Sequence, residues 1–188
     1  MLRQRQGKKP TPAGTPETTE MKERFEFRDI RPEEYDRAAE IEQIVFPPNE
    51  ANAPADVKAL ARTATECFLV AVDTENGEIA GFLSGRATDE DRFRDEFFTD
   101  QSLHDPDGEN IILLSLDIVP EYQGHGLGRE VMRRYCLREQ ARGRKKLILT
   151  CLPRLVDMYK KFGYTDKGLS GSTWGGETWH EMEIVLNK

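Results

Sequence analysis

The sequence predicts an α/β (α+β) domain in which a sheet is covered by helices. Residues 25–30 alternate apolar and polar side chains, as a half-buried strand does. Residues 67–72 and 78–86 are two apolar runs joined by a turn with an Asn-Gly pair, which is typical of a hairpin. An apolar strand over 111–119 leads into an amphipathic helix over 126–142. Strands mixed with helices in this way favour one sheet with helical layers.

The first helix begins at residues 31–34, where a proline stands in the first turn and two glutamates stabilise the positive end of the helix dipole. It ends at residue 46, because a residue before proline avoids the helical region. A second helix is expected over 55–64. The buried stripe of the first helix is expected to consist of Tyr35, Ala38, Ala39, Ile41, Ile44 and Val45.

The rest of the chain continues the mixed pattern. Residues 88–110 form an acidic stretch whose length suggests a functional loop. After the helix over 126–142 we expect a buried strand over 146–151, a short helix over 154–162 and a final strand over 179–186. The inner face of the long helix would hold Leu127, Val131, Met132, Tyr135 and Cys136.

The length of 188 residues suits one domain, and 37% hydrophobic against 32% charged residues supplies a packed core. Residues 1–20 are rich in Pro, Thr, Gly and basic side chains without periodicity, so we expect a disordered tail. Residues 21–188 are then a single domain. No apolar run approaches the roughly 18 residues of a membrane span, no signal peptide is recognisable, and three cysteines form no CxxC pair. These features favour a cytoplasmic protein.

The net charge of −7 argues against general nucleic-acid binding, which depends on an excess of Lys and Arg. Two stretches depart from the average. Residues 88–110 carry nine acidic and two basic side chains, and residues 126–146 carry eight basic and two acidic ones. The basic stretch is either a solvated helix face or the neighbour of a small anionic ligand such as a nucleotide phosphate.

The segment from Leu116 to Arg129 carries the clearest chemical signal. A buried strand leads into a turn with glycines at 124, 126 and 128 that opens the basic helix. Free backbone N–H groups and the positive end of the helix dipole make such a turn an anion cradle. Arg129 stands where a dinucleotide fingerprint needs its third glycine, and no Gly-Lys-Ser/Thr follows, so Rossmann and P-loop sites are disfavoured.

Two motifs resemble those of the GNAT N-acetyltransferases. Gln123-Gly124-His125-Gly126-Leu127-Gly128 is similar to the Q/R-x-x-G-x-G/A acetyl-CoA motif of that family. The segment from Thr150 to Tyr164 is similar to the C-x-x-x-L-V-x-F-Y-x-x-F-G-F pattern of its arylalkylamine (serotonin-type) members. With residues 46–51 and Glu181-Met182, the resemblance covers residues 25–186.

The resemblance implies a mixed sheet of about seven strands, splayed between strands four and five and flanked by about four helices. It also implies acetyl-CoA as cosubstrate, with pantetheine in the cleft between the splayed strands. Backbone groups around Leu116 and Ile118 would bind the pantetheine arm. The backbone N–H groups that would hold the pyrophosphate belong to Gln123, Gly124, His125, Gly126, Leu127, Gly128 and Arg129.

The resemblance also implies catalytic residues. Tyr159 matches the family's tyrosine, which as general acid protonates the departing CoA thiolate. Ile112 and Leu114 replace the two histidines of the vertebrate enzymes on strand four. Insect dopamine-type relatives place a glutamate in an F-x-x-D-E segment, which makes Glu50 the expected base, acting through water. Ser115 and Asp117 on strand four are the weaker candidates for that base.

A small primary amine, either an arylalkylamine or a polyamine-like molecule, is the expected acceptor, attacked directly in a ternary complex. The acidic stretch over 88–110 would attract a cationic acceptor. A peptide or protein N-terminal acetyltransferase and a catalytically silent acyl-CoA-binding module are the alternatives. No metal is implied, because His180 lacks the second histidine of a zinc helix, and Cys151 is expected to be a buried strand residue. A monomer or a homodimer without membrane contact is expected.

Overall fold

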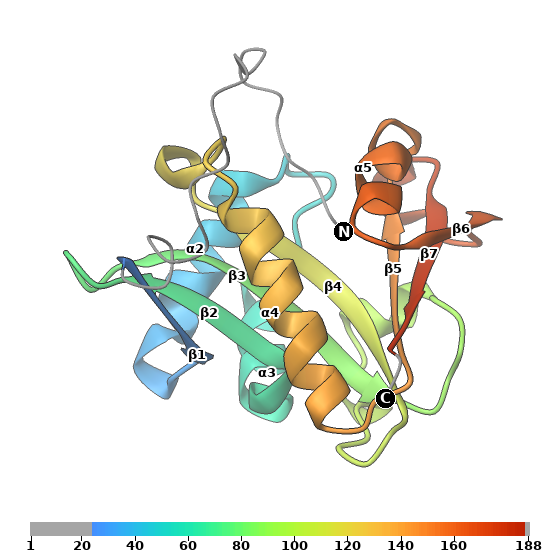
Figure 1. The fold of residues 1–188 in the computed structure, drawn as a ribbon, viewed down its shortest axis with the longest axis horizontal. Coiled ribbons are helices and arrows are strands. Elements are labelled where there is room, and N and C mark those ends of the chain that lie inside the picture. The colour runs from blue at the N-terminus through green and yellow to red at the C-terminus, as the bar shows by residue number, and fades with distance from the viewer. Residues whose placement is uncertain (1–23, 187–188) are drawn as a thin grey trace.

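The computed structural model describes residues 24–186 and contains one seven-stranded sheet in the order β1-β2-β3-β4-β5-β7-β6 (Figure 1). Neighbouring strands are antiparallel except β4 and β5, which are parallel. The sheet is therefore mixed, as the sequence predicts. The strands are β1 (Phe25–Asp29), β2 (Phe68–Asp73), β3 (Ile79–Thr88), β4 (Asn110–Ile118), β5 (Lys146–Cys151), β6 (Thr165–Leu169) and β7 (His180–Val185).

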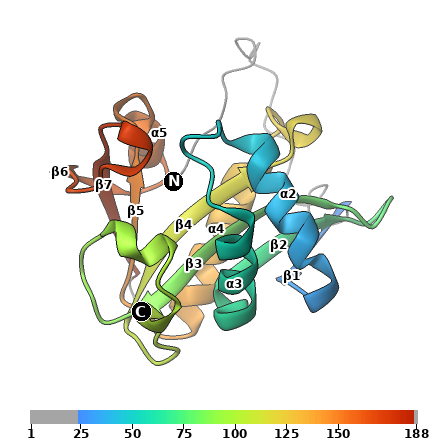
Figure 2. The ribbon, with the colours of Figure 1, turned by 180° about the vertical axis from the view of Figure 1, so that it is seen from behind.

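Helices cover both faces of the sheet. The helix α4 (Leu127–Ala141) crosses one face, and α2 (Tyr35–Val45) with α3 (Pro54–Thr63) covers the other (Figures 1 and 2). The short α5 (Val156–Lys161) lies at the end that holds β5, β6 and β7. Each lies within a few residues of its predicted range, because apolar periodicity and proline starts define these helices locally.

The strands β4 and β5 pair only at their beginnings. Asn110, Ile111 and Ile112 face Lys146, Leu147 and Ile148, and no pairing continues beyond Ile112. The rest of β4 keeps its other partner, β3, as far as Ile118. The two strands therefore diverge toward their carboxyl ends, which confirms the predicted splay and leaves backbone groups of β4 facing the gap.

A β-bulge lies on β4 beside this gap. Ser84 faces Ser115 and Gly85 faces Leu113, so β4 has one extra residue, Leu114, at that step. A bulge bends its strand and changes the direction of the side chains that follow. Ser115 and Asp117 then project together toward the face that α2 covers, where Ser115 contacts Glu42.

Two details differ from the sequence prediction. Ile44 is 54% exposed, whereas Glu42 on the same helix is 0% exposed. The buried face of α2 is thus rotated by part of a turn relative to the predicted one, and it includes the acid Glu42. The strand β6, in which polar residues predominate, was not expected from its residue pattern and forms by pairing with β7.

The expected tail over residues 1–20 lies outside the described residues. Within residues 24–186, no helix is long and apolar enough to cross a membrane. The three cysteines are all free, and Cys67 and Cys151 are buried.

Candidate active site

The glycine turn between β4 and α4 has the geometry of an anion cradle. Gly124 and Gly126 have φ of 81° and 86°, in the left-handed region that glycine adopts without strain. Gly126 caps the helix, and its carbonyl accepts the first helical bond from the N–H of Glu130 at 3.1 Å. The N–H groups of the preceding residues, from Leu127 to Arg129, belong to the first turn, where no intrahelical acceptor exists. They are placed to bind phosphate oxygens.

The turn is anchored by its own polar side chains. Gln123 Nε2 donates to the carbonyl of Ile118 at 2.7 Å, which ties the turn to the end of β4. The Tyr122 hydroxyl donates to Asp73 Oδ2 at 3.0 Å, at the end of β2. His125 is exposed at the tip. The Ile118 carbonyl, expected to contact pantetheine, is thus already an acceptor for Gln123.

A groove beside this turn separates α4 from α5 and β7. Its volume is about 240 Å³. Its lining combines apolar surface with three cationic side chains: Arg129, Met132, Arg133, Cys136, Leu137, Lys161, Phe162 and Ile184. Such a mixture suits a nucleotide, whose flat base packs on apolar groups while its phosphates bind cations.

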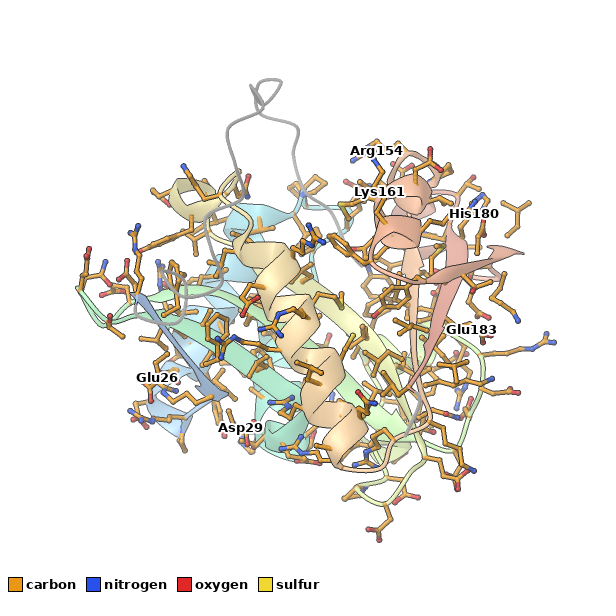
Figure 3. All side chains as sticks on the ribbon, viewed as in Figure 1. Glu26, Asp29, Arg154, Lys161, His180 and Glu183 are labelled. Carbon is orange, nitrogen blue, oxygen red and sulfur yellow. The ribbon has the colours of Figure 1, made fainter. Side chains whose placement is uncertain are left out.

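Most positive charges of the basic stretch are neutralised within the protein. Arg133 and Arg134 both bind Glu130, and Arg138 binds Asp29 of β1 at 2.8 Å, beside the carboxyl-terminal half of α4 (Figure 3). The stretch is therefore mainly structural. Arg129, which has no ion pair within residues 24–186 and lines the groove, is its member best placed to bind an anion together with the turn.

Tyr159 lies on α5 and is fully buried. Its ring packs edge-on against Tyr164 and Phe162, with centroids 5.7 and 6.0 Å away. Its hydroxyl has no hydrogen-bond partner among residues 24–186. Burial, with a smaller contribution from Cys151, raises the pKa of Tyr159 well above its ordinary value of 10. The phenol therefore stays protonated, as a general acid must be.

Glu50 lies in the segment that joins α2 to α3 and is 1% exposed. Its N–H donates to the carbonyl of Pro47 at 2.9 Å. Its own carbonyl accepts from Trp174 Nε1 at 2.9 Å. A buried carboxylate can serve as a base for a proton that it reaches directly or through one water molecule.

The segment over residues 170–179 closes against the one that carries Glu50. Asn49 Nδ2 donates to the carbonyl of Gly175 at 3.0 Å, and the Trp174 ring lies 4.3 Å from that of Phe98. A Cβ at Gly175 would lie 2.7 Å from the carbonyl oxygen of Asn49, so only glycine fits there. These contacts join the segment between β6 and β7 to the segment between α2 and α3.

Ser115 and Asp117 meet on β4. The Ser115 hydroxyl lies within hydrogen-bond distance of Asp117 Oδ1, and 2.7 Å from Glu42 Oε2 of α2. Asp117 is fully buried, and burial together with the charge of Glu42 raises its pKa well above 3.8. The structure thus joins two of the four predicted catalytic residues directly. It does not join Tyr159 to them by a hydrogen bond.

Glu42 is a polar residue of the site that the sequence reasoning missed. It lies four residues after Ala38, so both are on the same, buried face of α2. An acid at a position that helical periodicity assigns to the core is the signal that could have identified it.

One further cluster has side chains of the kinds that bind metals. Glu66 Oε1 lies 2.8 Å from His104 Nε2 and 3.9 Å from Cys67 Sγ. His104 Nδ1 accepts the N–H of Ala87, so the ring proton is on Nε2 and is donated to Glu66. Burial raises the pKa of Cys67 to about 12. Metal ligation needs a deprotonated thiol and a free imidazole nitrogen. These side chains therefore fit a hydrogen bond between His104 and Glu66 better than a metal site.

The splayed mixed sheet with a glycine turn at a helix N-terminus places the chain in the GNAT fold class, as solved structures of the same fold show. This chain belongs to the acetyltransferase (GNAT) family, whose model matches residues 24–164. It is a GNAT N-acetyltransferase, and acetyl-CoA is its cosubstrate. The resemblance of its two motifs to this family is confirmed.

Relatives of known name support the same fold. The serotonin N-acetyltransferase of Mesocricetus auratus is 28% identical over 164 residues, which cover 86% of this chain and 77% of that protein. The loading GNATL domain of CurA from Lyngbya majuscula has a TM-score of 0.75 at 14% identity, over 86% of this chain and 98% of that one. The yncA protein of Salmonella typhimurium, solved with acetyl-CoA, has a TM-score of 0.59 at 16% identity, over 87% and 95%.

Proposed function

We propose that the protein transfers the acetyl group of acetyl-CoA to the primary amine of a small cationic acceptor, an arylalkylamine or a polyamine-like molecule. The observation that carries this proposal is the burial of three carboxylates: Glu42 and Asp117, which meet at Ser115 beneath α2, and Glu50, in the segment that follows α2. The name of the curated relative supports an arylalkylamine. The expected cytoplasmic location and the choice between monomer and homodimer stay predictions.

In the proposed reaction both substrates are bound together. The N–H groups from Gln123 to Arg129 hold the pyrophosphate, and backbone groups around Leu116 and Ile118 hold pantetheine along the free edge of β4. The acceptor arrives as an ammonium ion, which cannot attack. Glu50, acting through water, removes one proton, and the neutral nitrogen attacks the thioester carbonyl.

The bond changes then balance. A C–N bond forms, the C–S bond breaks, and Tyr159 gives its proton to the departing thiolate. The nitrogen loses its second proton to solvent, and the tyrosinate regains one from solvent. No acyl-enzyme is required, which is consistent with Cys151, whose burial raises its pKa to about 12 and keeps the thiol protonated.

A peptide or protein N-terminal acetyltransferase is the second candidate, and it needs an open groove for a peptide backbone. The contacts of Asn49 with Gly175 and of Trp174 with Glu50 lie across the place where such a groove would open. This closure favours a small acceptor.

Thiol release from acetyl-CoA with a panel of amines tests the proposal. We expect turnover with arylalkylamines or polyamines and little with peptides that have a free N-terminus. Turnover with peptides alone would favour the second candidate. Absence of turnover together with tight CoA binding would favour a silent acyl-CoA-binding module. Calorimetry of CoA binding to Gly126→Val tests the turn separately, because a branched side chain at a left-handed position strains the cradle, and unchanged affinity would contradict its assignment.

A further inference from the structure

Two buried acids share a single hydroxyl group beneath the site. Glu42 and Asp117 are both 0% exposed, and the Ser115 hydroxyl lies between them. Among the described residues that line the adjoining cavity there is no Lys, Arg or His, and Asp56 of α3 adds another carboxyl. The remaining polar groups that face the cavity are Asn52 and Ser84. The buried Arg86 of β3 is not part of this lining and donates to the carbonyl of Phe97 and to Gln101 Oε1. No cation therefore lies in the cavity beside the two acids.

The number of protons in this group follows from its hydrogen bonds. A serine hydroxyl has one hydrogen and can donate to only one of the two acids. Its contact with the other acid therefore needs a proton on that acid. Burial of two adjacent carboxylates without a counter-ion favours the same outcome, because their repulsion and desolvation oppose a second charge.

The neighbouring donors decide which acid is charged. Asn52 donates twice to Glu42 Oε1, from its backbone N–H and from Nδ2, both at 2.8 Å. Asp117 Oδ2 has no hydrogen-bond partner within residues 24–186. Hydrogen bonds to a carboxylate stabilise its charged form. The charge therefore lies on Glu42, and Asp117 donates its proton to Ser115, which donates to Glu42.

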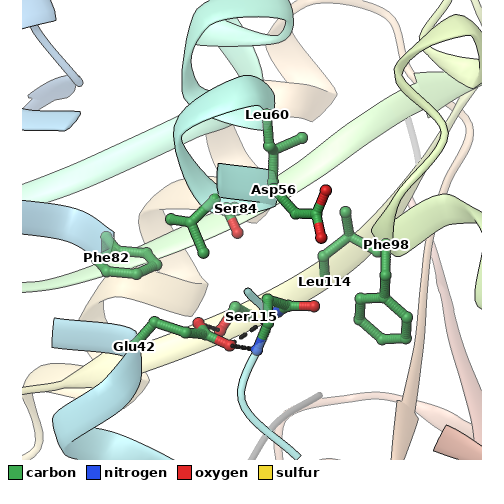
Figure 4. A pocket seen from close by; sticks show the side chains of 10 residues that line it. Glu42, Asp56, Leu60, Phe82, Ser84, Phe98, Leu114 and Ser115 are labelled. Carbon is green, nitrogen blue, oxygen red and sulfur yellow. Dashed lines mark hydrogen bonds between the residues drawn. The ribbon is translucent and has the colours of Figure 1, made fainter. Parts of the chain in front are cut away.

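One acceptor position on Glu42 remains. A carboxylate offers about four lone-pair positions, of which Asn52 takes two and Ser115 takes one. The cavity beside Glu42 and Ser115 has a volume of about 10 Å³, which is roughly enough for one water-sized group. Glu42, Asp56 and Ser115 surround it from three different elements (Figure 4). An ammonium group has this size and carries only donors.

We propose that Glu42 and Asp117 hold one proton between them through Ser115, and that the single negative charge left on Glu42 binds the ammonium group of the acceptor. This rests on the proposed function and adds to it the group that recognises the amine. Glu42 then binds the cation, while Glu50 keeps the separate role of base.

The first experiment detects the proton shared by Glu42 and Asp117 by infrared spectroscopy, so it does not depend on enzyme activity. Infrared spectra of the protein at pH 7 should show the carbonyl stretch of a buried protonated carboxyl. Asp117→Asn should remove this band. Glu42→Gln should remove it as well, because the new amide donates to Ser115 and turns the serine hydrogen toward an ionised Asp117. Glu40→Gln, an exposed acid on the same helix, should leave it. A parent spectrum without the band, or a band that survives Asp117→Asn, would overturn the shared proton.

The second experiment measures recognition of the ammonium group. Glu42→Gln should raise KM for 2-phenylethylamine about 10- to 100-fold, the range expected when a hydrogen bond to a charged group is lost. It should change KM for hydroxylamine, which is neutral at pH 7, by much less. Glu40→Gln should change neither. Equal effects on the two acceptors, or no effect on 2-phenylethylamine, would overturn the assignment.

Two further measurements separate this inference from the proposed function. Asp117→Asn retains a donor toward Ser115 and should raise KM less than Glu42→Gln does, which guards against a misfolded Glu42 variant. If the parent acetylates neither amine, the proposed function fails. Calorimetric titration of 2-phenylethylamine into the CoA-bound parent and Glu42→Gln then decides the inference, because only the parent should bind.

Discussion

Among residues 24–186, two glutamates are 0% exposed, and their surroundings are opposite. Glu139 near the end of α4 is surrounded by cations, with Arg138 Nε at 3.0 Å, Arg142 Nη1 at 2.9 Å and Arg144 Nε at 3.7 Å. Glu42 on α2 faces a second acid through Ser115 and is held only by neutral donors.

The two environments indicate different roles, a structural one for Glu139 and a functional one for Glu42. The arginines around Glu139 compensate its charge, and Arg138 continues to Asp29 of β1, so the cluster ties α4 to the edge of the sheet. A buried pair of acids without a cation costs stability, since desolvation of the charge is not offset. Such uncompensated groups concentrate at functional sites, and this pair lies beside the splay of β4 and β5.

The largest expected effect concerns another uncompensated group, the Tyr159 hydroxyl. Tyr159→Phe keeps the packing of the ring and removes only the proton donor. The kcat for amine acetylation should fall by ~100- to 10,000-fold, the usual contribution of a general acid, while CoA affinity is kept. Stopped-flow thiol release and calorimetry measure the two quantities.

Tyr164→Phe is the matched control. Tyr164 is also buried, its ring packs against Tyr159, and its hydroxyl contacts Met132 Sδ at 3.2 Å. We expect the loss of the Tyr164 hydroxyl to change kcat much less than the loss of the Tyr159 hydroxyl does. Equal effects of the two substitutions would make Tyr159 a packing residue.

Glu50→Gln should lower kcat/KM by about 100-fold near neutral pH, because the amide keeps the shape and cannot accept a proton. The rate should partly recover as the pH rises, since more of the amine is then neutral without help. A pH–rate profile of the parent and the variant measures this. If the profile is unchanged while Asp117→Asn or Ser115→Ala lowers kcat at saturating amine, the base lies on β4, whereas a change in KM alone belongs to recognition of the ammonium group.

Glu139→Gln should lower the free energy of unfolding by roughly 2–3 kcal/mol, somewhat less than for a fully buried ion pair because its arginines reach water. Urea unfolding measures it. Glu130→Gln is the control, since the Glu130 side chain is itself 9% exposed and that of its partner Arg133 is 44% exposed, and we expect a loss of about 1 kcal/mol or less. If Glu139→Gln is as stable as Glu130→Gln, the arginine cluster around Glu139 does not have the structural role assigned to it.

The comparison also shows what the sequence could and could not predict. Alternation and helical periodicity placed the strands and helices within a few residues, because these signals are local. The glycine turn was predicted for the same reason, since positive φ at Gly124 and Gly126 needs glycine. The edge strand β6 was missed from its residues because its polar sequence becomes a strand only through its pairing with β7.

The sequence already surrounds Glu139 with arginines, because Arg138, Arg142 and Arg144 all lie close to it along the chain. The role of Glu42 could not be predicted in this way, because its partner Ser115 is distant along the chain and meets it only in the fold. The contact of Trp174 with Glu50 is equally non-local. Motif resemblance predicted roles for Tyr159 and Glu50, whereas the pairing of Glu42 with Asp117 could be recognised only in the folded structure.

The last expected effect is spread over several pH units, because the acid pair makes stability depend on pH. Burial and the charge of Glu42 raise the pKa of Asp117 in the folded state above its unfolded value. From about pH 4 up to that raised pKa, the folded state holds one more proton than the unfolded state, so stability falls as the pH rises, by at most about 1.4 kcal/mol per pH unit. Asp117→Asn removes this proton and should flatten the dependence. Urea unfolding of both proteins at several pH values measures it, and parallel curves would mean that Asp117 is ionised in the folded protein and that the pair carries two charges.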